Sequence, residues 1–260
     1  MLLKATIAAA IATLVAQTAT ALPLEGQFPP RISGGKESPH GSFPFLVAIL
    51  KRGDYFCAGS LLNNDTVLTA GHCFGDGHKQ IQVRAGSNDR TTGGQVSNVT
   101  GVMTHPQFDP HTCENDVAIV KISPAVGPDV VGEFARVAKN GSYPKPGKKR
   151  AAGWGQMKAG PHFSPPLPKK MREVELTAVS FSKCLEAYRH IGYPLKQSMV
   201  CVRDRGKTTC VGDSGGPLLD AGTGELEGVT SFGGDCGSHE LPGVSTAVGQ
   251  VFGFISRHAG

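Results

Sequence analysis

The sequence has 260 residues, of which 35 are glycine, 18 are proline and 18% are charged, and its formal net charge is +5. Glycine and proline are more frequent than in an average globular protein but rarer than in a low-complexity chain, so a disordered, collagen-like or coiled-coil protein is excluded, and the length allows one or two domains with a substantial core. Lysine and arginine occur in small groups without interleaved aromatic residues, so we interpret them as solvated loop charges and predict no nucleic-acid partner.

The chain begins with a segment typical of a cleaved signal peptide. Met1–Ala21 carries one early positive charge, Lys4, then the apolar stretch Ala5–Ala16 and the small-residue triplet Ala19-Thr20-Ala21. The apolar stretch is too short to span a bilayer, and the triplet is a typical cleavage site. No later segment is long and apolar enough to hold the protein in a membrane. We therefore predict a signal peptide at residues 1–21 and a secreted, extracellular protein without a membrane partner.

Short apolar and β-branched runs then recur between turn residues. In chain order they are Phe45–Leu50, Thr66–Thr69, Ile81–Arg84, Val117–Ile122, Arg150–Gly153, Val174–Val179, Pro217–Leu219, Glu227–Phe232 and Val244–Val248. Many short runs of this kind predict an all-β sandwich or barrel rather than βαβ units. We expect a proline-rich exposed loop at Ala159–Pro168. Only the tail, Gln250–His258, has helical periodicity.

Seven cysteines are distributed along the chain. In an oxidising compartment six of them are expected to pair and one to be left over, but the spacing leaves the connectivity open. A zinc site is disfavoured because no CxxC-type cluster has histidine at ligand spacing. We predict no metal and no cofactor. Three Asn-x-Ser/Thr triplets, at Asn64, Asn98 and Asn140, are candidate N-glycosylation sites.

Three clusters carry residues suited to nucleophilic catalysis. They are Thr69–Cys73, Glu114–Val120 and Gly212–Pro217. A serine flanked by glycines lies on a sharp turn that exposes its hydroxyl, and an imidazole titrates in the right range to take the hydroxyl proton. A carboxylate fixes the tautomer of that imidazole. The chain order His, Asp, Ser is the order found in proteases of the chymotrypsin type.

From Ile32 to Gly260 the chain resembles the trypsin/chymotrypsin-fold serine proteases. The resemblance rests on six blocks in the family's order: Arg31-Ile32-Ser33-Gly34-Gly35, Thr69-Ala70-Gly71-His72-Cys73, Asp116 before Val-Ala-Ile-Val, Gly153-Trp154-Gly155, Gly212-Asp213-Ser214-Gly215-Gly216-Pro217 and Ser231-Phe232-Gly233. It implies two packed antiparallel six-stranded β-barrels with a C-terminal helix, and an active site between the barrels.

The resemblance also implies the role of each catalytic group. Ser214 is the nucleophile, His72 the general base and then acid, and Asp116 the group that orients His72. The backbone N–H groups of Gly212 and Ser214 form the oxyanion hole. The implied disulfides are Cys57–Cys73, Cys184–Cys201 and Cys210–Cys236. They leave Cys113 unpaired. It is interpreted either as a modifiable thiol near the substrate or as a small, partly buried hydrophobic residue, and intermolecular pairing is a third, weaker alternative.

A proenzyme is a further implication of the resemblance. Residues 22–31 are then an activation propeptide, and residues 32–260 are the protease domain. Cleavage after Arg31 frees the α-amino group of Ile32, which pairs in the interior with Asp213 and organises the oxyanion hole. We expect a separate trypsin-like protease to activate the chain.

The primary specificity pocket is expected to be deep and neutral. By the resemblance, Thr208 lies at its base, Gly233 and Gly243 leave its walls open, and Ser231 and Phe232 line it. A neutral pocket favours large apolar residues before the scissile bond, because a buried substrate cation would be unpaired. Asp235 is the competing carboxylate and leaves Arg/Lys specificity as the alternative.

Three further expectations concern partners, metals and rival functions. The partners are protein or peptide substrates and protein inhibitors, and the enzyme is expected to be a monomer. Ser87 stands where calcium-binding relatives have a glutamate, so no metal is predicted. A non-catalytic binding homologue is disfavoured because all three catalytic residues are present, and an esterase or lipase of the α/β-hydrolase type because its order is Ser, Asp, His.

Overall fold

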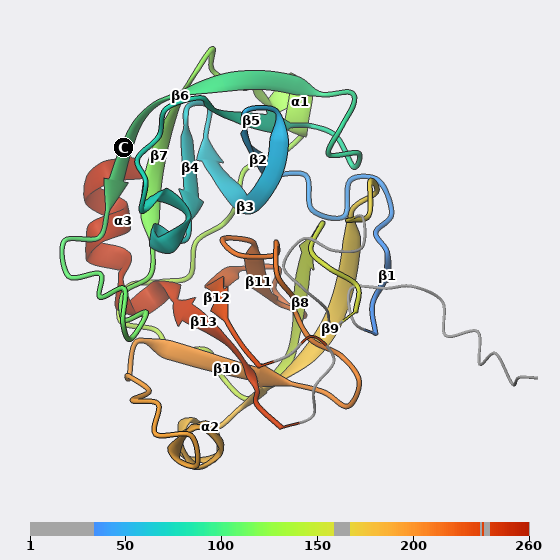
Figure 1. The fold of residues 1–260 in the computed structure, drawn as a ribbon. Helices are drawn as coiled ribbons and strands as arrows, with labels where there is room; N and C mark the ends of the chain where they lie inside the picture. Colours follow the sequence, from blue (N-terminus) through green and yellow to red (C-terminus); the bar gives the residue numbers. More distant parts are fainter. Residues whose placement is uncertain (1–33, 159–166, 235, 237–239, 260) are drawn as a thin grey trace, which may run out of the picture.

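The computed structural model describes residues 34–158, 167–234, 236 and 240–259 (Figure 1). The strands are β1 Lys36–Glu37, β2 Leu46–Lys51, β3 Asp54–Asn63, β4 Thr66–Thr69, β5 Ile81–Ala85, β6 Gln95–Thr104, β7 Ala118–Ser123, β8 Gly147–Gly153, β9 Arg172–Val179, β10 Met199–Arg203, β11 Pro217–Asp220, β12 Leu226–Phe232 and β13 Gly243–Ala247. The helices are α1 Pro128–Val131, α2 Phe181–Arg189 and α3 Phe252–Ala259, with 3₁₀ turns at Gly71–Phe74 and Val248–Gln250.

The strands close into two antiparallel barrels. The first has the order β2-β3-β4-β7-β6-β5, and the second has the order β8-β9-β10-β13-β12-β11. The second barrel closes because β9 pairs with β10 on one side and with β8 on the other. Figure 1 shows the first barrel in the upper half of the molecule and the second in the lower half. The predicted fold, two six-stranded barrels with a C-terminal helix, is confirmed.

The C-terminal helix packs on the first barrel, which is the barrel farther from it in sequence. In α3, Phe254 and Ile255 are buried in the same cluster as the core of the first barrel, and α3 lies beside β7 in Figure 1. Burying such side chains contributes about 2 kcal/mol each. The C-terminal helix, which follows the second barrel in the sequence, therefore connects that half of the chain to the first barrel.

The prediction that only the tail is helical was wrong, because α2 is also a helix. Its N-cap is Ser180, whose side chain accepts a hydrogen bond from the Lys183 N–H. Only Cys184 and Tyr188, four residues apart, are buried. An exposed helix with two inward residues on one face gives little apolar periodicity to detect.

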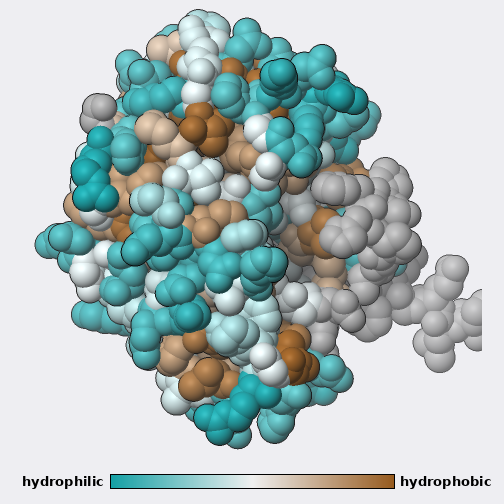
Figure 2. Space-filling model, turned by 60° about the vertical axis from the view of Figure 1, so that its left-hand side comes forward, coloured by the Kyte–Doolittle hydropathy of each residue, from teal (hydrophilic) through white to brown (hydrophobic). Residues whose placement is uncertain are grey.

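Three predicted features can be compared directly with the covalent and surface structure. Disulfides join Cys57–Cys73, Cys184–Cys201 and Cys210–Cys236, and Cys113 is a free, partly buried thiol. Asn64, Asn98 and Asn140 are all exposed. On the face shown in Figure 2, hydrophobic residues form small groups among hydrophilic ones, as on most water-exposed surfaces. Within the described ranges, no helix has both the length and the apolar character needed to cross a membrane.

Several expectations fall outside the described residues. These are the signal peptide at 1–21, the propeptide at 22–31, the cleavage site at Arg31 and Ile32, the carboxylate of Asp235 and most of the proline-rich loop at Ala159–Pro168.

Candidate active site

A cleft of about 810 Å³ brings residues of both barrels together. The first barrel contributes Phe56, His72 and the Cys57–Cys73 disulfide. The second barrel contributes the Gly212–Ser214 turn and the end of β12. The candidate nucleophile and the candidate base, which are far apart in sequence, therefore face the same space.

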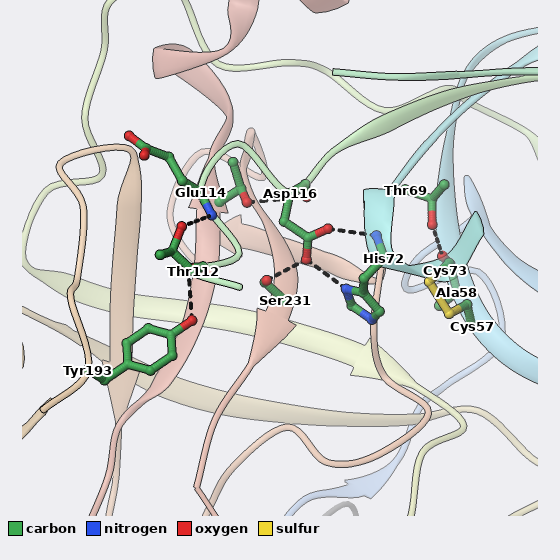
Figure 3. A network of polar contacts seen from close by, with 11 residues as sticks. Cys57, Ala58, Thr69, His72, Cys73, Thr112, Glu114, Asp116, Tyr193 and Ser231 are labelled. Carbon is green, nitrogen blue, oxygen red and sulfur yellow. Dashed lines mark hydrogen bonds and ion pairs between the residues drawn. A yellow bond between two sulfur atoms is a disulfide. The ribbon is translucent and has the colours of Figure 1, made fainter. Parts of the chain in front are cut away.

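His72 and Asp116 form a close, directed pair in this cleft. One Asp116 carboxylate oxygen lies 2.7 Å from His72 Nδ1, and the other accepts the His72 backbone N–H at 2.8 Å. Asp116 is fully buried, whereas the His72 side chain is 33% exposed. Figure 3 shows the imidazole turned so that its other nitrogen points away from Asp116. Holding Nδ1 as the donor leaves Nε2 free to accept a proton.

Two residues of the second barrel complete the surroundings of Asp116. The Ser231 hydroxyl donates to the same carboxylate oxygen that faces His72 Nδ1, at 2.5 Å (Figure 3). The Thr246 hydroxyl donates to the Asp116 carbonyl oxygen at 3.2 Å. The sequence placed Ser231 in the substrate pocket but gave no sign of its bond to Asp116, because 115 residues separate the two.

Ser214 lies on a tight turn that is anchored to the first barrel. The Ala58 N–H donates to the Ser214 carbonyl oxygen at 2.8 Å. Gly215 has φ +79°, and a Cβ there would lie 2.3 Å from the Ala58 carbonyl oxygen, so only glycine fits. In the described part of the chain no hydrogen bond joins the Ser214 hydroxyl to His72. Such bonds often form only when substrate is bound.

The two expected oxyanion donors have no internal acceptor. Among the residues that the structure describes, neither the Gly212 N–H nor the Ser214 N–H donates a hydrogen bond. Both residues line the cleft. Two N–H donors of one turn without an internal acceptor suit an oxygen that gains negative charge during reaction.

Asp213, between these donors, points into the interior. Its carboxylate accepts the N–H groups of Gly155 at 2.8 Å and Cys210 at 2.9 Å. A Cβ on Gly153 or Gly155 would lie within 2.7 Å of its oxygens, so glycines make room for it. Burial raises the pKa of Asp213 to about 6. A buried carboxylate of this kind favours a cationic partner.

The structure brings together only some of the predicted pocket residues. Ser231, Phe232 and Gly233 line the cleft. Thr208 and Gly243 are not among its lining residues; they lie beside one another and beside Thr209, which does line it. The Thr208 hydroxyl donates to the Thr209 carbonyl oxygen at 2.9 Å. Glu240 and Leu241, which the sequence analysis did not single out, also line the cleft.

Cys113 lies close to this machinery, beside Tyr193 and Ser231. Burial, with a smaller contribution from Asp116, raises the pKa of its thiol. We therefore predict that iodoacetamide alkylates Cys113 slowly at pH 7 and faster only as the pH rises beyond the ordinary thiol range, because the thiolate is the nucleophile. Mass spectrometry of the intact protein measures the rate, and Cys113→Ser should take up no label. Alkylation faster than that of glutathione at pH 7 would contradict this prediction.

The chain is similar to known serine proteases over most of its length. A family model described as Trypsin matches residues 32–255. The chain is 34% identical to alkaline trypsin A of Manduca sexta over 244 residues, covering 89% of this chain and 92% of the relative, and 31% identical to trypsin beta of Drosophila erecta over 231 residues, covering 88% of each. Among solved structures it is similar to neuropsin, a serine protease expressed in the limbic system of mouse brain, with 30% identity and a TM-score of 0.76 over 86% of this chain and 97% of that one.

Proposed function

Because the chain belongs to the trypsin family and is a serine endopeptidase, we propose that Ser214, His72 and Asp116 are its catalytic residues. His72 takes the Ser214 proton as Ser214 attacks the scissile carbonyl, and then gives it to the leaving amine. Asp116 keeps the imidazole in the required tautomer and stabilises its charged form. Water hydrolyses the acyl-enzyme by the same steps.

The observation that carries this proposal is the pairing of His72 with a fully buried Asp116 at the cleft that Ser214 lines. The two free N–H groups of Gly212 and Ser214 support it, because they suit the oxygen of a tetrahedral intermediate. A non-catalytic homologue would have no need for this set.

Covalent labelling tests the proposal directly. Protein cleaved after Arg31 should react with a fluorophosphonate at Ser214, and peptide mapping should locate the adduct there. The Ser214→Ala variant and protein unfolded in urea should remain unlabelled. A binding homologue would fold equally well and take up no label.

We also place the chain among secreted proenzymes, with a signal peptide at 1–21, a propeptide at 22–31 and a protease domain at 32–260. Three disulfides support an oxidising compartment. The enclosed carboxylate of Asp213 supports activation by the Ile32 amino group. The proposed partners are protein or peptide substrates, an activating trypsin-like protease and protein inhibitors, and the proposed state is a monomer.

We further propose that the enzyme cleaves after large apolar residues. The support is the neutral Thr208, the absence of side chains at the neighbouring Gly233 and Gly243, and the apolar Phe232 in the cleft wall. Cleavage after Arg or Lys is the second candidate. It is favoured by the trypsin names of the relatives and by Glu240, a carboxylate in the cleft wall.

Two chromogenic peptides that differ only in the residue before the scissile bond decide between these specificities. We expect kcat/KM for the phenylalanine peptide to exceed that for the arginine peptide about a hundredfold, because a buried substrate cation without a partner is costly. Faster turnover of the arginine peptide would overturn the apolar assignment. The variants Asp235→Asn and Glu240→Gln would then show which carboxylate recognises the cation.

A further inference from the structure

The backbone around Gly212 is held through its carbonyl oxygens. Three consecutive peptide units join Val211 to Ser214, and the carbonyl oxygen of each accepts one hydrogen bond. The bonds are Gln156 N to Val211 O at 2.8 Å, Tyr55 Oη to Gly212 O at 2.5 Å, and Gly216 N to Asp213 O at 2.9 Å. In a trans peptide the N–H points opposite to the C=O. Tying these oxygens therefore sets the directions in which the free N–H groups of Gly212 and Ser214 point.

Of these three hydrogen bonds, only the middle one comes from a side chain. Tyr55 lies on β3 of the first barrel, 157 residues from Gly212. The peptide unit that it holds connects the two units that carry the free donors. Gly212 has φ +95°, and a glycine can adopt many other backbone conformations at small cost. Within the loop, the Asp213 N–H of the same unit donates to the Cys210 carbonyl oxygen at 2.9 Å. The Tyr55 hydroxyl supplies the contact that holds this unit from outside the loop.

Tyr55 is itself firmly placed. The residue is 5% exposed, and its ring packs edge-on against Trp154 with the centroids 5.7 Å apart. The guanidinium carbon of Arg90 lies 5.9 Å from the ring centroid. Burial and the nearby Asp213 raise the pKa of Tyr55 well above its ordinary value, so its hydroxyl remains a donor throughout the neutral and mildly alkaline range.

We infer that Tyr55 is a positioning residue for the oxyanion hole. From the first barrel, its hydroxyl orients the Gly212–Asp213 peptide unit of the second, so that the Gly212 and Ser214 N–H groups point into the cleft together. This inference rests on the proposed function of those two N–H groups. On this inference, the hydrogen bond from Tyr55 to Gly212, which joins the two barrels, is part of the catalytic geometry.

The test is the activated Tyr55→Phe variant, which keeps the ring that packs on Trp154. We expect kcat to fall about tenfold with KM nearly unchanged, less than the loss on removing an oxyanion donor itself. A peptide boronic acid, whose tetrahedral adduct uses the oxyanion hole, should lose affinity by a similar factor. Indole, which fills only an apolar primary pocket, should bind as before.

Tyr143→Phe is the matched control. The Tyr143 hydroxyl also donates to a backbone carbonyl, that of Met199, at 2.6 Å, and Tyr143 does not line the cleft. It should leave kcat and boronate affinity unchanged. If Tyr55→Phe lowers only the melting temperature, Tyr55 has a merely structural role and the inference is wrong. If the unsubstituted protein neither cleaves peptides nor takes up fluorophosphonate, the proposed function is wrong, and the inference with it.

Discussion

Replacing Asp116 by asparagine should lower kcat about ten-thousandfold while leaving the fold intact. One carboxylate oxygen of Asp116 faces the His72 backbone N–H, and the other faces both His72 Nδ1 and the Ser231 hydroxyl. An asparagine that keeps its oxygen toward the backbone N–H turns its NH₂ group toward Nδ1. Nδ1 of His72 must then accept a hydrogen bond from this NH₂ group, so the imidazole proton moves to Nε2. His72 can no longer take the Ser214 proton.

Ser231→Ala is the control for this prediction. It removes one of three donors to the same carboxylate but leaves the tautomer of His72 unchanged. Its kcat should fall about tenfold or less. Both variants are cleaved after Arg31 by an added trypsin-like protease and compared by initial rates and melting temperature. If Asp116→Asn were no worse than Ser231→Ala, Asp116 would not set the tautomer.

Replacing Asp213 by asparagine should lower kcat/KM of the cleaved enzyme about a thousandfold, because removing one partner of a buried ion pair costs about 3–5 kcal/mol. Asp213 is 1% exposed, and two backbone N–H groups hold its carboxylate in a space that glycines leave open. An amide there cannot pair with the new amino group of Ile32. The neighbouring donors Gly212 and Ser214 then lose their anchor.

The uncleaved Arg31→Gln variant provides the comparison for Asp213. It should have almost no activity, and full activity would refute the proposed activation.

Because burial raises the pKa of Asp213 to about 6, its protonated form is favoured by folding. That stabilisation is complete below the unfolded pKa of about 4 and is lost as the pH rises through 6, by about 3 kcal/mol. The uncleaved chain should show this loss relative to its Asp213→Asn form, and the cleaved chain should not.

Local sequence patterns predicted most strands but not all of them. The run Thr66–Thr69 coincides with β4, and Ile81–Arg84 lies within β5, whose side chains alternate between the core and the surface. In β6 only Ser97 is buried, so no apolar alternation marks it. It is a strand because its backbone pairs with β5 and β7 and so closes the barrel. A hydrogen-bonding requirement of this kind leaves no trace in side-chain hydrophobicity.

The sequence by itself determined which groups can react. A serine between glycines, a histidine beside a cysteine and an aspartate before a buried strand are local features, because each depends on residue type and immediate neighbours. Only the tertiary structure decided what holds those groups in place. The bonds from Ser231 to Asp116 and from Tyr55 to Gly212 span 115 and 157 residues. They exist because the two barrels pack against each other, and no local pattern encodes which side chains meet across that junction.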